Sequence, residues 1–333
     1  MKMNKYIGHP SQLGGVEEVI LAQGKGKGMN LLQIKNAKGL DMTLVCDRAM
    51  DISRLSFHGV NLGWFSPAGY VAPGLYDDAK GRGFLQNFTA GFLTTCGLTA
   101  VGGSVMDDGE STPMHGLISS TPCEHYHYYE TDEEIVVEAT VREASLFACH
   151  TEMKRTYKVS KTENKLTLSD TITNIGNKTA PSMVLYHFNM GYPLLTENAR
   201  IMIPEISSKP TLDLFEKDYP QRKQMEKPTP GYTEKCFLYD VKEENGKAKF
   251  GMYNPDSGVG FTMTYNKKEL PFLTEWKMMG EYEYVLGLEP GNAWPIGRKQ
   301  MRENGELKFL EPGESFTTEI VLDFMDQPFT LGE

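Results

Sequence analysis

The stretch Glu134-Ile-Val-Val-Glu-Ala-Thr-Val-Arg142 alternates apolar and polar side chains along most of its length. Successive side chains of an extended strand point to opposite faces, so this alternation predicts a strand with one buried face. The same alternation returns at residues 153–159 and 165–173. Asn174-Ile-Gly-Asn177 then predicts a turn, and the whole segment is typical of neighbouring antiparallel strands.

Further strands are predicted along the rest of the chain, with turn signals between them. They fall at 183–189, 249–253, 258–265, 284–288 and 315–324, and no long amphipathic helix is evident. This pattern predicts an all-β fold, a large antiparallel sandwich. Residues 63–114 are rich in glycine and poor in strand signals, so we expect them to be functional or to cover a site. We expect one domain over residues 1–333.

The bulk composition is that of an ordinary globular protein. The chain has 333 residues, of which 40% are hydrophobic and 23% charged, and its net charge is -10. Such a charge disfavours nucleic acid and anionic membranes as partners, and no run of about 18 apolar residues predicts a membrane span. The first residues lack an apolar signal segment, and the cysteines number five, without a C-x-x-C pair. We therefore expect a reduced, cytoplasmic protein.

Two polar groups interrupt the apolar run of residues 183–195. His187 and Asn189 are two residues apart, so they share one face of an extended strand. If buried they need partners, and they are either hydrogen-bonded core residues or the polar floor of a concave sheet. Glu289 ends another apolar strand, just before Pro290. It is either a solvated strand end or a half-buried carboxylate whose raised pKa would suit a base.

Histidines elsewhere leave similar alternatives open. His115, in the loop Pro113-Met-His-Gly116, is either a turn residue or a donor that faces a ligand. Cys123, His125 and His127 would share one strand face, as in a transition-metal site. No further ligand stands at a typical spacing, so we expect an exposed strand and no metal.

Three basic residues lie in apolar surroundings, namely Arg48, Lys277 and Arg298. Each is either a salt-bridged structural residue, such as Arg48 with Asp51, or part of a site for an anionic substituent. No P-loop appears, and no G-x-S-x-G motif indicates a serine hydrolase.

An ordered set of short segments carries a resemblance to a known family. They are Asp47–Ile52, Gly91–Leu98, Pro113–Gly116, Arg155–Tyr157, Tyr186–Pro193 and Leu288–Asn292. Together they resemble the galactose mutarotase-like (aldose 1-epimerase) superfamily, and more narrowly a bacterial branch of aldose-epimerase-like proteins. The resemblance implies a β-supersandwich with a concave carbohydrate cleft, no cofactor, and interconversion of sugar anomers by acid/base ring opening and closure.

The resemblance also implies roles for single residues. Glu289 matches the glutamate base, His187 lies on the strand of the histidine acid, and His115 matches the histidine that binds near the ring oxygen. The match departs in one respect: the acid usually precedes the Phe of Phe-Asn by three residues, whereas His187 directly precedes Phe188. A shift of two residues along a strand keeps the same face. The acid is therefore either His187 or His115.

The remaining residues expected to contact the sugar are Arg48, Asp51, Asn189, Trp276, Lys277, Asn292 and Arg298. Trp276 would stack on the apolar face of the sugar ring. Two alternatives to a mutarotase stay open: a carbohydrate-binding protein without turnover, and an epimerase or isomerase of an unusual, acidic or phosphorylated sugar. The sequence does not identify the sugar or the oligomeric state.

Overall fold

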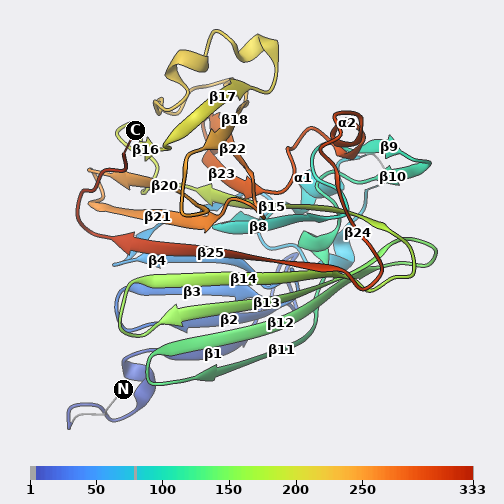
Figure 1. Ribbon diagram of the computed structural model, residues 1–333. Helices are drawn as coiled ribbons and strands as arrows, with labels where there is room; N and C mark the ends of the chain where they lie inside the picture. The colour runs from blue at the N-terminus through green and yellow to red at the C-terminus, as the bar shows by residue number, and fades with distance from the viewer. Residues whose placement is uncertain (1–4, 79–80, 333) are drawn as a thin grey trace.

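The largest sheet is built around the segment that opened the sequence analysis. In the computed structural model, which describes residues 5–78 and 81–332, it has nine antiparallel strands in the order β11-β12-β13-β14-β25-β21-β20-β16, with β19 paired to β20 (Figure 1). They are β11 (Cys123–Glu130), β12 (Glu134–Ala144), β13 (His150–Ser160), β14 (Lys165–Asn174), β25 (Ser315–Met325), β21 (Val259–Asn266), β20 (Lys247–Asn254), β16 (Arg200–Met202) and β19 (Glu243–Glu244). Buried and half-buried residues alternate strictly along β14, as the sequence predicts.

A second sheet carries the cavity described below. Among the described residues it has seven strands in the order β17-β18-β22-β23-β15-β24, with β8 also paired to β15. They are β17 (Glu205–Pro210), β18 (Lys235–Val241), β22 (Phe272–Met279), β23 (Tyr284–Gly291), β15 (Ala180–Met190), β24 (Lys308–Leu310) and β8 (Leu93–Leu98). Every residue of β15 is buried, which explains why its sequence is nearly continuously apolar.

The third sheet was missed in the sequence, where we predicted no strand before residue 123. Five strands are described in it: β1 (Gly15–Ile20), β2 (Asn30–Lys35), β3 (Leu40–Val45), β4 (Asp51–Phe57) and β5 (Val60–Asn61). A register shift between Thr43 and Leu44 interrupts the pairing of β3 with β4. Such a bulge breaks the period of two on which strand prediction depends.

Short elements complete the described chain. Two-residue and three-residue strands form the pairs β6 (Trp64–Phe65) with β7 (Ala90–Gly91), and β9 (Val105–Asp107) with β10 (Glu110–Thr112). The helices are α1 (Gly83–Asn87) and α2 (Arg298–Glu303), and 3-10 turns lie at Pro10–Gln12, Pro73–Leu75, Ile118–Ser120, Asp213–Phe215 and Tyr219–Gln221. In the parts of the chain described, no helix is long and apolar enough to cross a membrane.

The sheets are packed around one large group of buried apolar side chains. It includes Leu44 from the five-stranded sheet, Leu168 and Phe261 from the nine-stranded sheet, and Phe188 from the seven-stranded sheet. Figure 1 shows β2 and β3 behind β12, β13 and β14, so these two sheets face each other. The prediction of an all-β antiparallel supersandwich is confirmed, whereas a single domain over residues 1–333 stays a prediction.

A buried ionic network joins the three sheets. The Arg155 guanidinium on β13 lies 2.9 and 2.7 Å from the two carboxylate oxygens of Asp170 on β14, and 2.7 Å from Oδ1 of Asp51 on β4. It also donates to Thr95 on β8 at 2.8 Å, and the Tyr186 hydroxyl on β15 donates to Asp170 at 2.7 Å. Because Arg155 and Asp170 are almost fully buried, this network fixes how the sheets dock.

Candidate active site

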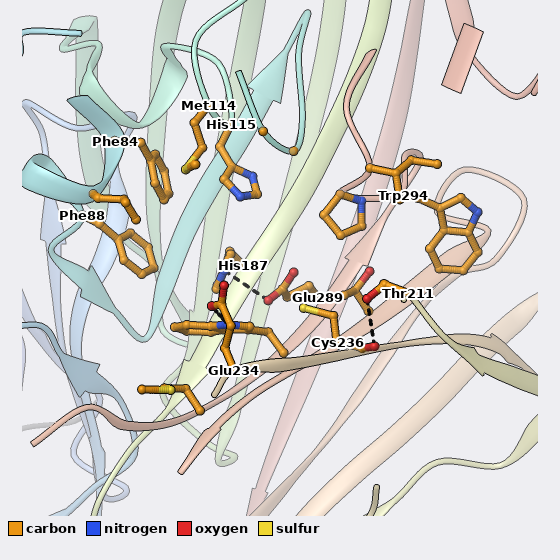
Figure 2. A pocket seen from close by; sticks show the side chains of 18 of the residues that line it. Phe84, Phe88, Met114, His115, His187, Thr211, Glu234, Cys236, Glu289 and Trp294 are labelled. Carbon is orange, nitrogen blue, oxygen red and sulfur yellow. Dashed lines mark hydrogen bonds and ion pairs between the residues drawn. The ribbon is translucent and has the colours of Figure 1, made fainter. Parts of the chain in front are cut away.

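A cavity of about 1260 Å³ opens over one face of the seven-stranded sheet. Its floor includes residues of β15, β22 and β23, and its walls come from loops around residues 64–68, 82–88, 209–212 and 294–306. The glycine-rich region 63–114, which we expected to cover a site, supplies much of one wall. In Figure 2 His187 and Glu289 lie in the centre, with Phe84 and Phe88 on one side and Trp294 on the other.

Strand register brings the two central residues together. Strand β15 pairs antiparallel with β23 so that Leu185 faces Gly291 and Phe188 faces Leu288. This register sets His187 opposite Glu289, although they are far apart in sequence. Nε2 of His187 lies 3.1 Å from Oε1 of Glu289, and both side chains are less than a tenth exposed.

The cavity floor holds buried polar atoms that lack hydrogen-bond partners among the described residues. They are Nδ1 of His187, Nδ1 of His115, Oε1 of Glu289 and Oγ1 of Thr274. Oε1 of Glu289 is close to His187, but the two groups are not aligned as a hydrogen bond. Buried polar groups normally find partners. Four such atoms at one cavity are available to hydrogen-bond a polar ligand.

Burial pushes both central side chains towards their neutral forms. It raises the pKa of Glu289 well above its usual range, and the nearby Glu234 carboxylate adds to this rise. It lowers the pKa of His187 to about 3, with a further contribution from His115. Burial therefore favours a proton on the Glu289 carboxyl and a free nitrogen on His187. One acid and one base then stand side by side.

His115 reaches the same cavity from the loop that follows β10. Its ring centroid lies 6.0 Å from that of His187, and burial lowers its pKa to about 4. The backbone of His115 has φ +56, an uncommon conformation for a residue with a side chain. Gly97 donates to its carbonyl and Gly102 accepts from its amide, which holds this loop in place. His115 thus presents an unpartnered nitrogen above the pair (Figure 2).

An aromatic wall surrounds the pair. The rings of Trp276 and Phe88 each lie 5.3 Å from the His187 ring, between centroids. Trp64 lies 6.4 Å from both of them, and the Trp276 indole donates to Glu234 at 2.7 Å. Aromatic faces of this kind bind the apolar faces of sugar rings while polar groups bind the hydroxyls.

Lys277 and Arg298, expected near the substrate, do not line the cavity. Lys277 is the neighbour of Trp276 on β22, so its side chain points to the opposite face of the sheet. Its Nζ lies 2.6 Å from a carboxylate oxygen of Glu226. Arg298 is bound by Asp107 at 2.8 Å and Glu110 at 2.7 Å. These contacts correct our expectation, since both cations are already paired in structural ion pairs.

Asn292, Arg48 and Asp51 also lie outside the cavity lining. The Asn292 side chain accepts from the backbone amide of Val184 at 2.6 Å, which joins β23 to β15. Arg48 donates to the carbonyl of Val71 at 3.0 Å, and burial lowers its pKa to about 10. Asp51 belongs to the Arg155 network. All three residues stabilise the scaffold, and this again corrects the expectation of sugar contacts.

Asn189 shares the face of His187, as expected from the spacing, but it is fully buried outside the cavity lining. Its amide donates to the carbonyl of His187 at 2.8 Å, while its Oδ1 has no partner among the described residues. Asn189 therefore supports the strand that carries His187.

Sequence reasoning missed several residues that line the cavity, among them Arg82, Lys209, Glu234, Cys236 and Thr274. Of these, only Thr274 could have been predicted from the sequence. It precedes Trp276 by two residues, so both side chains lie on the same face of the strand. The other four come from α1, β17 and β18 and their flanking loops, whose approach to the site depends on the fold.

The candidate metal ligands do not assemble into a centre. No group of three or more His, Cys, Asp or Glu residues is placed to hold a metal ion in the portion of the chain described. A register shift interrupts β11 between Cys123 and His125, and His127 instead lies 3.0 Å from exposed Glu138.

Replacing Gly287 by alanine is expected to reduce activity without unfolding the protein. A Cβ at Gly287 would lie 2.4 Å from Oε1 of Glu289 and 3.1 Å from Trp276, so the carboxyl would have to move. We expect a loss of about tenfold or more in kcat/KM, with Tm little changed. Gly74→Ala is a matched control, because its Cβ meets nothing within 4 Å and it lies outside the cavity lining. Equal activities for the two variants would contradict the placement of Glu289.

Comparisons with known proteins agree with this architecture. The family model described as a domain of unknown function (DUF4432) matches residues 26–324. A Klebsiella pneumoniae structure, provisionally named an aldose 1-epimerase, is 26% identical with a TM-score of 0.86, over 93% of this chain and 83% of that one. No curated protein matches the chain.

More distant solved structures share the fold. A galactose mutarotase-like protein from Clostridium acetobutylicum is 15% identical with a TM-score of 0.66, over 95% of this chain and 99% of that one. Galactose 1-epimerase from Lactobacillus acidophilus is 12% identical with a TM-score of 0.61, over 95% of this chain and all (100%) of the other. The chain therefore belongs to the DUF4432 family and has the fold of the galactose mutarotase-like (aldose 1-epimerase) superfamily.

Proposed function

We propose that this protein is an aldose 1-epimerase-like isomerase that interconverts the anomers of a sugar. The observation that carries the proposal is the buried His187–Glu289 pair, 3.1 Å apart on the floor of the cavity. Its two members titrate in opposite directions, so the pair offers one proton donor and one proton acceptor to a bound ligand.

The proposed reaction needs only these two proton transfers. In one, the acceptor removes the proton from the anomeric hydroxyl; in the other, the donor protonates the ring oxygen. The bond from the anomeric carbon to the ring oxygen breaks, a carbonyl forms, and rotation presents its other face. Closure reverses both transfers, so the pair regains its starting proton and no redox partner is required.

The roles of the two residues follow from their environment. The family resemblance assigns Glu289 as the base and His187 as the acid. The pKa directions favour the reverse start, with the proton on Glu289. Because opening and closure are each other's reverse, each group acts once as acid and once as base in a turnover. His115 contributes a further hydrogen-bonding nitrogen.

The charges around the cavity support a neutral sugar. The case for a phosphorylated or acidic substrate rested on three cations. They are Arg48, Lys277 and Arg298, and they do not line the cavity. Among the described residues the cations that do are Arg82 and Lys209, and they are outnumbered by glutamates at positions 234, 283 and 306. An anionic substituent near Glu234 would be repelled, so neutral aldoses are the preferred class.

Turnover is also better supported than binding alone. The reason for considering a protein without catalysis was the unusual spacing between His187 and Phe188. The register of β15 against β23 nevertheless sets His187 opposite Glu289. The spacing therefore does not separate the acid from the base.

The decisive test is anomer exchange measured by saturation-transfer NMR on neutral, acidic and phosphorylated aldoses. We expect the protein to accelerate exchange of neutral sugars and to leave the charged ones near their spontaneous rates. No acceleration of any sugar by folded protein would refute the mutarotase proposal.

The pH profile of kcat/KM is expected to show no loss of activity near pH 6.5, where an ordinary histidine takes up a proton. Activity requires neutral His187, so acidification reduces the rate only as pH approaches the lowered pKa of about 3, far below 6.5. Activity also requires protonated Glu289, whose raised pKa places the alkaline loss above the ordinary value of 4.5. Exchange rates across pH 4 to 9, corrected for spontaneous mutarotation, measure this profile. A half-loss of activity near pH 6.5 on the acid side would contradict it.

A further inference from the structure

A second, shallower groove of about 330 Å³ lies beside the cavity. It is lined by residues of β4, β5 and β6 together with Tyr192, Tyr282 and Tyr284. Trp64 lines both the cavity and the groove, so the two spaces meet at its side chain. The groove and the cavity are therefore neighbours on the two sides of one residue.

Two tyrosines stand exposed at this groove. Tyr192 is 73% exposed and Tyr282 is 93% exposed. Tyr282 also has φ +65, a conformation that glycine or asparagine usually adopts and that is costly for a bulky residue. A large ring kept in water at a strained turn gains nothing from packing. The exposed face of the Tyr282 ring is suited to stack on a bound ligand.

Polar groups accompany these rings. The Arg54 guanidinium stacks 4.7 Å from the centre of the Phe65 ring and, within the described residues, forms no ion pair with a carboxylate. Asn61 donates to the carbonyls of Gly63 and Tyr192 at 2.7 Å each, which fixes the Tyr192 backbone beside β5. The groove thus combines aromatic faces with free N–H donors, the same combination that lines the cavity.

The aromatic wall connects the groove to the catalytic pair. Trp276 lies 5.3 Å from His187 and 6.4 Å from Trp64, between ring centroids. One aromatic residue therefore separates the ring of His187 from the residue shared with the groove. The main cavity, at about 1260 Å³, already exceeds the range of about 300–1,000 Å³ usual for small-molecule sites.

We propose that the groove is a second sugar subsite and that the preferred ligand is a reducing oligosaccharide. Its reducing-end aldose lies over His187 and Glu289, and its next sugar lies between Tyr192 and Tyr282. The position of the reducing-end sugar rests on the proposed function, whereas the position of the second sugar does not. Ring opening requires a free anomeric hydroxyl, so the second sugar is joined through another hydroxyl of the reducing unit.

The test compares monosaccharides with reducing disaccharides of different linkage, using glucose and galactose beside maltose, cellobiose, lactose and gentiobiose. Affinity is measured by titration calorimetry, and anomer exchange by saturation-transfer NMR on the same samples. The variants are Tyr282→Gly, which removes the ring and relieves the positive φ, and Tyr192→Ala. Tyr129→Ala, on exposed strand β11, is the matched control.

We expect at least one disaccharide to bind more tightly than either monosaccharide. Each groove variant should weaken that affinity about tenfold, leave monosaccharide affinity within about twofold, and differ from Tyr129→Ala. Equal affinities for mono- and disaccharides, or equal losses for both in the variants, would overturn the subsite. Tyrosine-dependent disaccharide binding without exchange would keep the subsite and refute the mutarotase instead.

Discussion

Glu289→Gln is expected to lower kcat/KM for anomer exchange by about 10²- to 10⁴-fold. Glutamine keeps the shape of the side chain but can neither release nor accept the proton that passes between substrate and enzyme. The loss corresponds to about 3–5 kcal/mol of transition-state stabilisation. Saturation-transfer NMR measures the rate, and titration calorimetry measures sugar affinity, which we expect to change much less.

The folded state should tolerate this substitution well. Glu289 is almost fully buried, so removing an ionisable group from this position does not destabilise the protein. Glu244→Gln, at an exposed position on β19, is the control for a change of the same type. If Glu289→Gln retained exchange close to that of the control, Glu289 would not be part of the acid/base pair.

Arg155→Met is expected to destabilise the protein by about 3–5 kcal/mol at pH 7. Arg155 neutralises Asp51 and Asp170, which are both buried, and donates to Thr95 as well. Methionine fills a similar volume but leaves two carboxylates without a cation in the interior. Urea unfolding followed by tryptophan fluorescence gives the change in the free energy of unfolding.

Arg142→Met is the matched control, because Arg142 is exposed, its partner Glu124 is exposed, and Lys154 remains beside its other partner Glu152. We expect no measurable change from it. In the double variant Arg155→Met, Asp170→Leu, part of the lost stability should return, because one of the two buried carboxylates left without a cation is removed. A single variant as stable as the Arg142→Met control would show that the network does not hold the sheets together.

Much of the fold followed from sequence periodicity. The segments predicted at 134–142, 153–159 and 165–173 are the centres of β12, β13 and β14, each of which extends slightly further. Their alternation survives because one face of the sheet is packed and the other is not. In the five-stranded sheet, which was missed, a bulge at Ser53 of β4 disturbs that period.

The candidate site was only partly predictable. His187 and Glu289 stand out because each is a polar group in an otherwise apolar strand. Lys277 and Arg298 likewise have apolar neighbours in the sequence, but their partners Glu226 and Asp107 are remote in sequence. Composition of a segment therefore does not tell a cavity residue from a buried ion pair, since the difference depends on which face a neighbouring element covers.

The sequence by itself determined six strands of the nine-stranded sheet, strands β15 and β23 of the seven-stranded sheet, the family resemblance and the face shared by His187 and Asn189, because these depend on local spacing. Only the tertiary structure decided that His187 stands opposite Glu289, that His115 comes from a distant loop to join them, and that Trp276 faces the cavity while Lys277 faces away. Strand order and register bring distant residues within reach, and no local pattern encodes them. The pKa shifts of the pair likewise arise from burial, which exists only once the sheets have packed.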